Sequence, residues 1–481
     1  MENNTTTEKY YITTAIDYIN GKPHIGHSYE KVAADVLARF HRQKIGKENV
    51  RFLTGTDEHG AKIEKFAQTA NVPIEKFADD ASAGFKLAWD NLDISYDRFI
   101  RTTDADHNQK VQEIVTKIRD NGFLYEADYE GLYCVGHEAF LTEKDLIDGL
   151  CPDHKVAPEL IKEKNWFLKV SAFTDTIKNK IESGEFQIYP EHAKKEILSM
   201  LNEGFNDIAA TRPNVKWGVT VPWDAEQTIY VWVDALINYV TGATSESGTD
   251  FWPANLHVIG PDIAKFHCII WPALLLAAGL EIPKGVAVHG FLTLNNQKIS
   301  KTTGNIIDPN DWVEKYGADA VRYFLLRETP FDAHGDVSEE KLRARYEGDL
   351  ANGLGNLVSR ITTLVEKNLD GVVPGGTTPE QEYIPTKIDN LITSYKFHEA
   401  LAEIWTEVAK ANKIVDETKL WELPKTDMDE FARVTKEVLV IIENVAKQLL
   451  PFIPTSAQKI LDSVTAEKIV KAQALFPRIE N

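Results

Sequence analysis

The chain has 481 residues, of which 43% are hydrophobic and 26% charged, a composition that excludes a disordered protein and indicates a folded globular one. This length exceeds what one hydrophobic core usually supports, so we expect roughly two to four domains. The net charge of −20 argues against general binding to nucleic acid, because affinity for phosphate backbones comes from Lys and Arg. We therefore expect no DNA partner, and RNA binding only through a local patch.

Cysteine content and the apolar segments bear on the cellular compartment. Three cysteines, Cys134, Cys151 and Cys268, argue against a disulfide framework and for a reducing environment. The first residues, MENNTTTEKY, have neither the apolar core of a signal peptide nor the Arg-rich pattern of a transit peptide. The most apolar run, CIIWPALLLAAGL, is too short to span a bilayer. We expect a cytoplasmic protein with no membrane partner.

The predicted elements begin with a strand, a helix and a second strand. The strand lies in YYITTAIDYI, the helix in EKVAADVLARFHRQKIG, and the second strand in NVRFLTGTDEHG. The helix carries Val32, Val36 and Phe40 on one face and is expected to end at Gly46. Strand, helix and strand with short connections form a βαβ unit, which favours a parallel sheet.

The rest of the chain changes character twice. Residues 119–200 hold two cysteines, short strand-like pieces and a charged helical run, FTDTIKNKIESG. Strand-like runs return in TIYVWVDAL, NLHVIGPDI and GVAVHGFLTL. From about Tyr346 the pattern is helical, with a loop expected in GGTTPEQEYIP. The predicted fold is an α/β domain split by an insertion and followed by an all-helical domain.

Two histidines flank a glycine where the first strand turns into the helix, in His24-Ile25-Gly26-His27. Such a pair could bind a metal ion, or could be two ordinary histidines. Alternatively, a helix N-terminus attracts phosphate, histidines there can donate to phosphate oxygens, and Gly26 leaves room for a flat base. The tetrapeptide alone does not decide between these interpretations.

A second polar stretch, NNQKISKTTGN, places Lys298 and Lys301 three residues apart around Ser300. It could be an ordinary solvated loop. It could also be a mobile cationic loop that neutralises a polyphosphate in a transition state.

In this order, on a split α/β fold, the two stretches resemble the paired signatures of class I aminoacyl-tRNA synthetases. The second reads KISKT here and differs from its commonest form conservatively, at two positions. Within this class the chain resembles the methionyl-tRNA synthetases over nearly its whole length, through AIDYINGKPHIGH, FLTGTDEHG, YVWVDALINY, VIGPDIAKFHCIIWPALL, VHGFLTLNNQKISKTTGN, NLVSR and KLWELPK. The insertion is too short for the editing domain of the leucine, isoleucine and valine enzymes.

The resemblance implies a ligase reaction and names for the parts of the chain. Methionine and Mg·ATP would form methionyl-adenylate, which is passed to the 3′ end of tRNA(Met) for initiation and elongation of translation. The implied parts are a Rossmann-like catalytic domain in two halves (1–118 and 201–290), a connective insertion (119–200), a KISKT loop and stem-contact region (291–345), and a helical anticodon-binding domain (346–481).

The resemblance also implies the site residues. A thioether packs well on aromatic rings, which suits Tyr18, Trp232 and Tyr239, and Asp57 would pair with the substrate ammonium. The methionine-binding set is Ala15, Ile16, Tyr18, Asp57, Trp232, Ala235, Tyr239, Ile263 and His267. The ATP-binding set is His24, Gly26, His27, Asp262, His289, Lys298, Ser300 and Lys301, with His24, His27, Lys298 and Lys301 as the catalytic residues.

One motif departs from the family pattern. The family usually has lysine before Asp262, where this chain has Pro261. Proline is tolerated at the first position of a helix, so the turn should survive while any contact of that lysine is lost.

His267 and Cys268 do not form a thiol–imidazole pair in our interpretation, because adjacent helical residues do not face each other.

The insertion contains two knuckle-like spacings, Cys134-x2-His137 and Cys151-x2-His154, which could hold a tetrahedral Zn²⁺. Many methionyl enzymes bind zinc here, commonly with more cysteines, and His137 stands where cysteine is usual. The alternative is an insertion that has lost its metal. We expect a zinc ion here. Its role should be structural, because four protein ligands leave no open position for chemistry.

In the helical domain, Asn356 and Arg360 are four residues apart, and Trp421 follows later in KLWELPK. They could be a helix cap and a core tryptophan. In the family the matching residues read the anticodon CAU, and stacking on aromatic rings is how single-stranded RNA is recognised. Leu420 stands where the family has proline. No further tRNA-binding domain follows in this sequence, so we expect a monomer.

Three other functions remain open at this point. The chain could be a synthetase for another apolar amino acid, which the aromatic pocket disfavours. It could be an inactive paralogue that binds tRNA or a protein, which the intact histidines, lysines and Asp57 disfavour. It could be a small-molecule nucleotidyltransferase of the same fold, which the helical domain disfavours.

Overall fold

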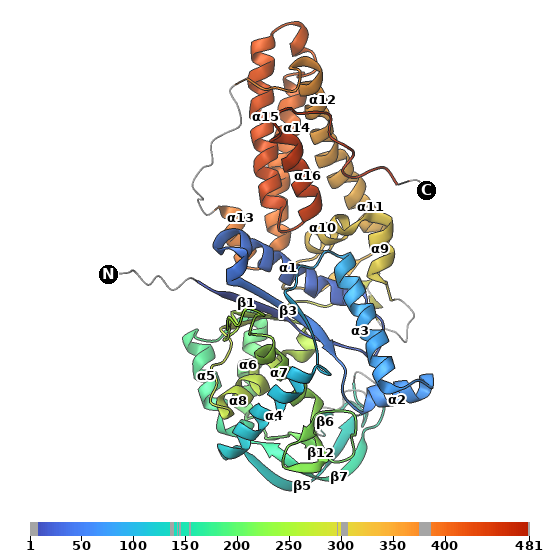
Figure 1. The fold of residues 1–481 in the computed structure, drawn as a ribbon, viewed down its shortest axis with the longest axis vertical. Coiled ribbons are helices and arrows are strands. Elements are labelled where there is room, and N and C mark those ends of the chain that lie inside the picture. Colours follow the sequence, from blue (N-terminus) through green and yellow to red (C-terminus); the bar gives the residue numbers. More distant parts are fainter. Residues whose placement is uncertain are drawn as a thin grey trace, which may run out of the picture. The chain divides into compact units, whose positions relative to one another are not determined.

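The structure, a computed structural model, describes residues 8–134, 139–141, 143, 146–152, 155–295, 297–299, 306–374 and 386–479. The chain forms two compact units (Figure 1). The first takes residues 1–23, 45–87 and 96–289, and the second takes 24–44, 88–95 and 290–481. The finer five-part division stays a prediction.

A parallel sheet forms the centre of the first unit, and it confirms the predicted α/β fold. All its strand pairs are parallel. β1 and β3 are buried along almost their whole length, as expected for strands of a parallel sheet covered on both faces. Its strand order is β2 (Asp17–Tyr18), β3 (Val50–Asp57), β1 (Tyr10–Thr14), β13 (Leu256–Ile259), β14 (Gly285–Val288) and β8 (Gln187–Tyr189), with β4 (Arg98–Arg101) paired to β3.

One close approach in this sheet requires glycine. A β-carbon on Gly55 of β3 would lie 1.8 Å from the carbonyl oxygen of Ile100 in β4. A side chain at this position would therefore force the two strands apart just before β3 ends at Asp57.

Helices of the first unit cover the sheet (Figure 1). They are α4 (Ala105–Asp120), α5 (Thr174–Ser183), α6 (Glu191–Glu203), α7 (Val231–Thr241) and α8 (Trp271–Ala277), while α2 (Ala61–Ala70) and α3 (Ile74–Asn91) follow β3. The strand predicted in TIYVWVDAL is largely wrong. The strand β12 (Asp224–Ile229) ends there and α7 begins at Val231. A short, mostly buried apolar run does not distinguish a strand from a helix.

Strands of the insertion and of the residues that follow it pair antiparallel in two smaller sheets. One sheet has the order β6 (Ala139–Leu141), β5 (Leu124–Cys134), β7 (Glu159–Leu168) and β9 (Ile208–Ala209), and another has β10 (Thr211–Arg212), β12 and β11 (Thr220–Val221). β8 lies within the residues that the sequence assigned to the insertion, yet it pairs with β14 in the parallel sheet. Only three residues long, it leaves too short a pattern to be recognised in the sequence.

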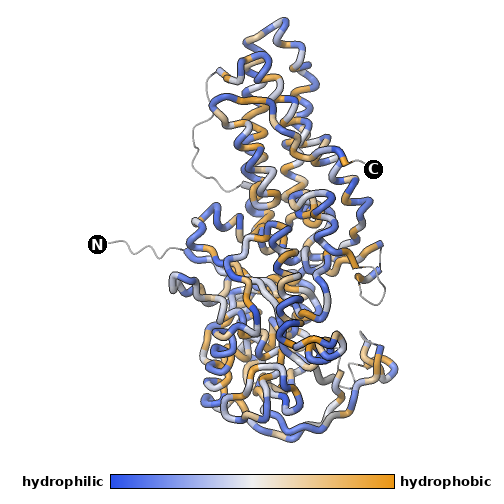
Figure 2. The backbone as a smooth tube through the Cα atoms, turned by 45° about the vertical axis from the view of Figure 1, so that its right-hand side comes forward, coloured by the Kyte–Doolittle hydropathy of each residue, from blue (hydrophilic) through white to orange (hydrophobic). Residues whose placement is uncertain are grey.

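The second unit contains α1 (Ile25–Ile45), which ends before Gly46 as predicted, and a small sheet of β16 (Gln297–Lys298), β15 (Leu292–Leu294) and β17 (Gly335–Val337). From residue 346 its described elements are helical, as predicted, and blue and orange alternate along them in Figure 2, as in amphipathic helices. GGTTPEQEYIP lies outside the described residues. The remaining helices are α9 (Pro309–Tyr316), α10 (Ala318–Glu328), α11 (Glu339–Arg345), the π-helical segment Tyr346–Gly355, α12 (Asn356–Asn368), α13 (Lys387–Thr393), α14 (Phe397–Glu417), α15 (Met428–Leu449) and α16 (Pro454–Val464).

Across the part of the chain that the structure describes, none of the helices combines the length and the apolar character needed to cross a membrane.

Candidate active site

Predicted site residues of the first unit follow the carboxyl ends of its parallel strands. Ala15 and Ile16 come directly after β1, Asp57 is the last residue of β3, and His289 comes directly after β14. Asp262 lies three residues beyond the end of β13. In open α/β sheets ligands bind at this edge, so the strands bring these side chains to the expected place.

An aromatic cluster joins α7 to the segment after β13. Trp232 stacks on Phe266, with ring centroids 3.8 Å apart and ring planes 10° from parallel. The hydroxyl of the buried Tyr239 lies 2.7 Å from Nε2 of His267, whose Nδ1 lies 3.0 Å from the carbonyl oxygen of Ile263. A carbonyl can only accept, so Nδ1 of His267 carries a proton, and in a neutral imidazole Tyr239 then donates to Nε2. The cluster is thus an apolar surface whose buried polar atoms are satisfied.

His257 packs behind this cluster and is held neutral. Trp271 donates its indole N–H to Nε2 of His257 over 3.2 Å, so Nδ1 carries the proton and donates to Thr13 Oγ1 at 2.7 Å. Burial, together with the neighbouring His267, lowers the pKa of His257 well below its usual value. The surroundings of Tyr239 therefore carry no imidazolium charge from His257 at neutral pH, which suits an uncharged side chain as ligand.

Asp57 pairs with Tyr18 between β3 and β2, and the residue after it, Glu58, is held by several hydrogen bonds. Asp57 and Tyr18 are register partners in the β2–β3 pair, and the carbonyl oxygen of Asp57 accepts from Ile19 N–H at 3.1 Å. The next residue, Glu58, is fully buried and accepts two hydrogen bonds from Arg101, at 2.7 and 2.9 Å, and one from Thr103. These bonds fix the backbone that presents Asp57.

The side chains of Asp262 and His289 both lie close to Gly260. A β-carbon on Gly260 would lie 2.9 Å from Oδ1 of Asp262 and 3.9 Å from Nε2 of His289. Pro261 occupies the first position of a short 3-10 helix, Pro261–Ile263, as the sequence predicted. The turn is therefore kept with proline in the position of the family's lysine.

Sequence reasoning missed several polar residues near this edge, namely Glu58, His59, Arg101, His107 and Asp234. His59 and His107 both contact the carboxylate of Asp234. Glu58, His59 and Asp234 stand inside motifs that carried the family resemblance, FLTGTDEHG and YVWVDALINY. No spacing in the sequence indicates that these segments meet, because the partners are up to 175 residues apart.

In the second unit, α1 begins inside His24-Ile25-Gly26-His27, as predicted. The two imidazole rings stack with centroids 3.6 Å apart, and the backbone N–H of His24 donates to Nδ1 of His27 at 3.2 Å. Because Nδ1 accepts, the proton of a neutral His27 lies on Nε2, the nitrogen that can donate to a phosphate oxygen. A β-carbon on Gly26 would lie 3.0 Å from the ring of His24.

The lysine-bearing stretch returns to the start of α1. The backbone N–H of Ile25 donates to the carbonyl oxygen of Ile307 at 3.1 Å. Lys298 lies in β16 as the register partner of Thr293, and only its backbone is described. Ser300 and Lys301 lie outside the described residues.

Two of the predicted anticodon residues, Arg360 and Trp421, come together in the second unit. Asn356 and Arg360 lie in α12, and the guanidinium of Arg360 lies 5.7 Å from the ring centroid of Trp421. Arg360 also forms an ion pair with Asp416 at 2.9 Å. Trp421 is 45% exposed, so the alternative of a core tryptophan is wrong.

Both cysteines of the predicted zinc site are buried, and neither forms a disulfide. The N–H of Cys151 donates to the carbonyl oxygen of Val156 at 2.9 Å, and its carbonyl oxygen accepts from the N–H of Lys155 at 2.8 Å. His137 and His154 lie outside the described residues. Without these two histidines, the described residues contain no group of three or more metal ligands.

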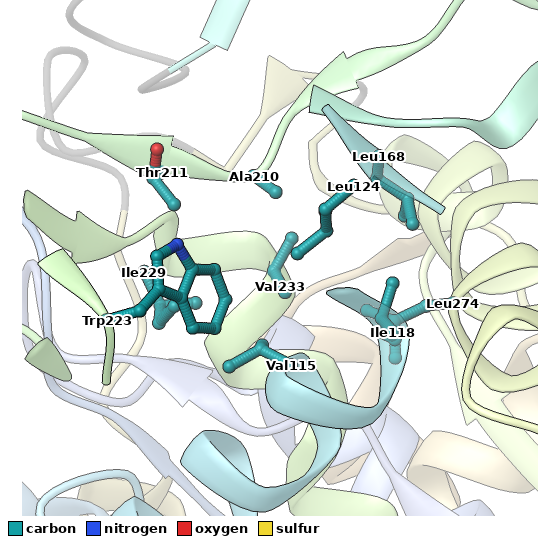
Figure 3. A pocket seen from close by; sticks show the side chains of 10 residues that line it. All are labelled: Val115, Ile118, Leu124, Leu168, Ala210, Thr211, Trp223, Ile229, Val233 and Leu274. Atoms are coloured by element: carbon teal, nitrogen blue, oxygen red, sulfur yellow. The ribbon is translucent and has the colours of Figure 1, made fainter. Parts of the chain in front are cut away.

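A cavity of about 10 Å³ in the first unit is lined by Val233 of α7 and nine other residues (Figure 3). Val233 of α7 and Trp223 point into it, and the other labelled residues are apolar except for Thr211. A cavity of this size and polarity holds at most one water molecule, so it is not an amino-acid site.

Comparisons with known proteins identify the family. The family model of the class I tRNA synthetases (M) matches residues 10–158 and 153–362. The methionine–tRNA ligase of Caldanaerobacter subterraneus subsp. tengcongensis is 40% identical, covering 98% of this chain and 79% of its own. That of Rhizobium meliloti is also 40% identical, covering 95% of this chain and 92% of its own.

A solved structure is similar over the whole chain. Mycobacterium tuberculosis methionyl-tRNA synthetase in complex with methionyl-adenylate superimposes with a TM-score of 0.91 at 37% identity, covering 98% of this chain and all of that one. Family match, identity and fold agree, and the chain belongs to the class I tRNA synthetases, in the methionyl-tRNA synthetase family.

Proposed function

We propose that this chain is a methionine–tRNA ligase that acts in two steps. The methionine carboxylate attacks the α-phosphate of ATP, forming methionyl-adenylate and releasing pyrophosphate. A hydroxyl of the 3′-terminal ribose of tRNA(Met) then attacks the acyl carbon, and AMP leaves. The observation that carries the proposal is the aromatic cluster of the first unit, in which Trp232 stacks on Phe266 and the Tyr239 hydroxyl is hydrogen-bonded to His267.

The methionine side chain would lie against Trp232 and Tyr239, because a polarisable thioether packs favourably on aromatic rings. Asp57 would pair with the ammonium group in a half-buried position, where a charge-assisted hydrogen bond is strong. The other proposed methionine-binding residues are Ala15, Ile16, Tyr18, Ala235, Ile263 and His267.

ATP would be held chiefly through its phosphates. His24 and His27, at the start of α1, would donate to phosphate oxygens, and Gly26 would leave room for adenine. Lys298 and Lys301 would stabilise the charge that builds on the leaving pyrophosphate, so catalysis rests on positioning and electrostatics. Mg²⁺ bound with ATP would neutralise further phosphate charge. Ser300, Asp262 and His289 complete the proposed ATP-binding set.

Zinc would be a structural ion in the insertion, held by Cys134, His137, Cys151 and His154. Two buried cysteines that form no disulfide fit a thiolate ligand set. Metal analysis of the purified protein should give one zinc per chain, lost in the Cys151→Ser variant. A wild-type protein purified without chelators that contains no zinc would refute this assignment.

Trp421 would stack on a base of the anticodon. Replacing it by alanine should raise KM for tRNA(Met) by about 10–100-fold, since one base–aromatic stack contributes about 1–3 kcal/mol. Pyrophosphate exchange without tRNA should stay at the wild-type rate. The matched control is Val470→Ala, because Val470 is also exposed, at 54%, and belongs to the same unit. An unchanged KM for tRNA in Trp421→Ala would remove this role.

The function as a whole is tested by ATP–pyrophosphate exchange without tRNA, comparing methionine with leucine, isoleucine, valine and cysteine. Exchange with methionine alone is expected. Exchange with another amino acid would keep the fold and overturn the pocket assignment. Folded protein without any exchange would favour an inactive paralogue.

A further inference from the structure

A buried carboxylate in α7 binds two histidines at once. Asp234 is fully buried, its Oδ2 lies 2.7 Å from Nδ1 of His59, and its Oδ1 lies 2.9 Å from Nε2 of His107. Both histidines are themselves buried. A carboxylate can only accept, so each imidazole donates to one of its oxygens. The negative charge is thereby compensated inside the core, where an uncompensated one would be very costly.

The two histidines come from different elements of the first unit. His59 follows β3, and its ring packs edge-on against Trp217, with centroids 5.6 Å apart. His107 lies in α4, and its Nδ1 is 3.1 Å from the hydroxyl of Thr241, the last residue of α7. One side chain of α7 therefore holds both α4 and the segment after β3.

These are the elements that present the proposed methionine site. Asp57 stands two residues before His59, and Asp234 lies between Trp232 and Ala235 on α7. The link from His59 to Asp234 sets how far the backbone of Asp57 lies from α7. Methionine must reach from an ammonium partner to an aromatic wall, so this spacing decides whether both ends fit together.

We propose that Asp234 is a positioning residue for methionine, acting through its bonds to His59 and His107. The inference rests on the proposed function. The proposed role of Asp234 differs from a purely structural role in its expected effect. Loss of these bonds should weaken methionine binding specifically, because errors of about 1 Å in the placement of site residues already have large effects.

The charge state of Asp234 supports this geometry. Burial alone would raise the pKa of the carboxyl, but the two imidazoles outweigh burial and bring the pKa down to about 2. Asp234 is therefore ionised at every pH at which the reaction would be assayed, and both of its oxygens remain acceptors.

The first test is Asp234→Asn, which keeps the shape but replaces one acceptor oxygen by an amide that donates. KM for methionine in pyrophosphate exchange should rise by about 10–100-fold, as for the loss of a hydrogen bond to a charged group. KM for ATP should stay near the wild-type value. Methionine affinity measured by tryptophan fluorescence should fall in parallel.

Donor-retaining variants separate positioning from packing. An asparagine amide nitrogen can replace Nδ1 of His59, and a glutamine amide nitrogen can replace Nε2 of His107. His59→Asn and His107→Gln should therefore keep KM for methionine close to wild type, whereas His59→Leu and His107→Leu should raise it. If Asp234→Asn does not fold, these two pairs of variants decide the matter.

The matched control is Arg51→Lys. Arg51 is a buried charged residue whose Nε donates to the carbonyl oxygen of Gly242, directly after α7, at 2.5 Å. It should lower thermal stability without changing KM for methionine. The proposal is wrong if Asp234→Asn lowers stability only, or raises both KM values equally. A wild-type protein that folds but shows no exchange with methionine would instead refute the proposed function.

Discussion

Replacing Lys301 by alanine is expected to slow formation of methionyl-adenylate by about 10²–10³-fold, the usual cost of removing one donor that stabilises transition-state charge. The substrates lose little binding in the ground state, because the lysine acts mainly as negative charge builds on pyrophosphate. KM for ATP should therefore change much less than kcat.

The described neighbourhood supports this expectation. Lys298 lies in β16, paired with β15, on one side of the Lys301 stretch. On the other side, the carbonyl oxygen of Ile307 accepts from the N–H of Ile25 inside the histidine motif. Both flanks of the stretch are thus anchored in the second unit, one of them at the start of α1.

Pyrophosphate exchange and single-turnover adenylate formation measure the effect. Lys315→Ala is the matched control, because Lys315 is an exposed lysine of the same unit that pairs with Glu339. Its exchange rate should equal that of wild type. A Lys301→Ala rate within twofold of wild type would remove Lys301 from the catalytic set.

Local patterns were enough to predict much of the fold. The helix in EKVAADVLARFHRQKIG and its end at Gly46 follow from periodicity and a stop residue. The structure confirms the helix and its end, and begins it earlier, at Ile25 inside the histidine motif. The strands at Leu256–Ile259 and Gly285–Val288 were recognisable as short apolar runs. α7 was not, because a helix buried on all sides has no polar face to reveal its period.

Some residues of the candidate site could be named from the sequence, and others could not. Trp232, Tyr239 and His267 were named through a family resemblance. The structure brings Tyr239 and His267 into contact, and it stacks Trp232 on Phe266, the residue before His267. The polar supports could not be predicted, because the bonds of Asp234 to His59 and His107 join residues far apart in sequence. Such contacts depend on how the elements pack, and no local spacing encodes them.

Arg322 in α10 is the centre of a buried polar network in the second unit. Arg322 and Asp35 of α1 are both fully buried, and Nη2 of Arg322 lies 2.6 Å from Oδ2 of Asp35. Asp35 also accepts from Arg39 and from Ser95. The other N–H groups of Arg322 donate to backbone carbonyl oxygens, those of Leu92, Asp93, Pro451 and Phe452. One side chain therefore ties the helix of the histidine motif to the turn between α15 and α16.

Replacing Arg322 by methionine is expected to lower the free energy of unfolding by about 3–5 kcal/mol, because it leaves a buried carboxylate and several carbonyl groups without their donor. The loss should shrink in acid. Burial alone would raise the pKa of Asp35, but Arg322, Arg39 and Ser95 outweigh burial and lower it. The ion pair is therefore fully present above the ordinary carboxyl pKa, and is lost as the pH falls through the lowered one.

Urea unfolding followed by circular dichroism measures the change, with Arg343→Met as control. Arg343 pairs with Glu347 on an exposed helix face, where such a pair contributes at most about 1 kcal/mol. The double variant with Asp35→Asn should lose less than the sum of the single losses, because the two side chains share one interaction. Additive losses, or an Arg322→Met cost no larger than that of the control, would mean that this network does not hold α1 in place.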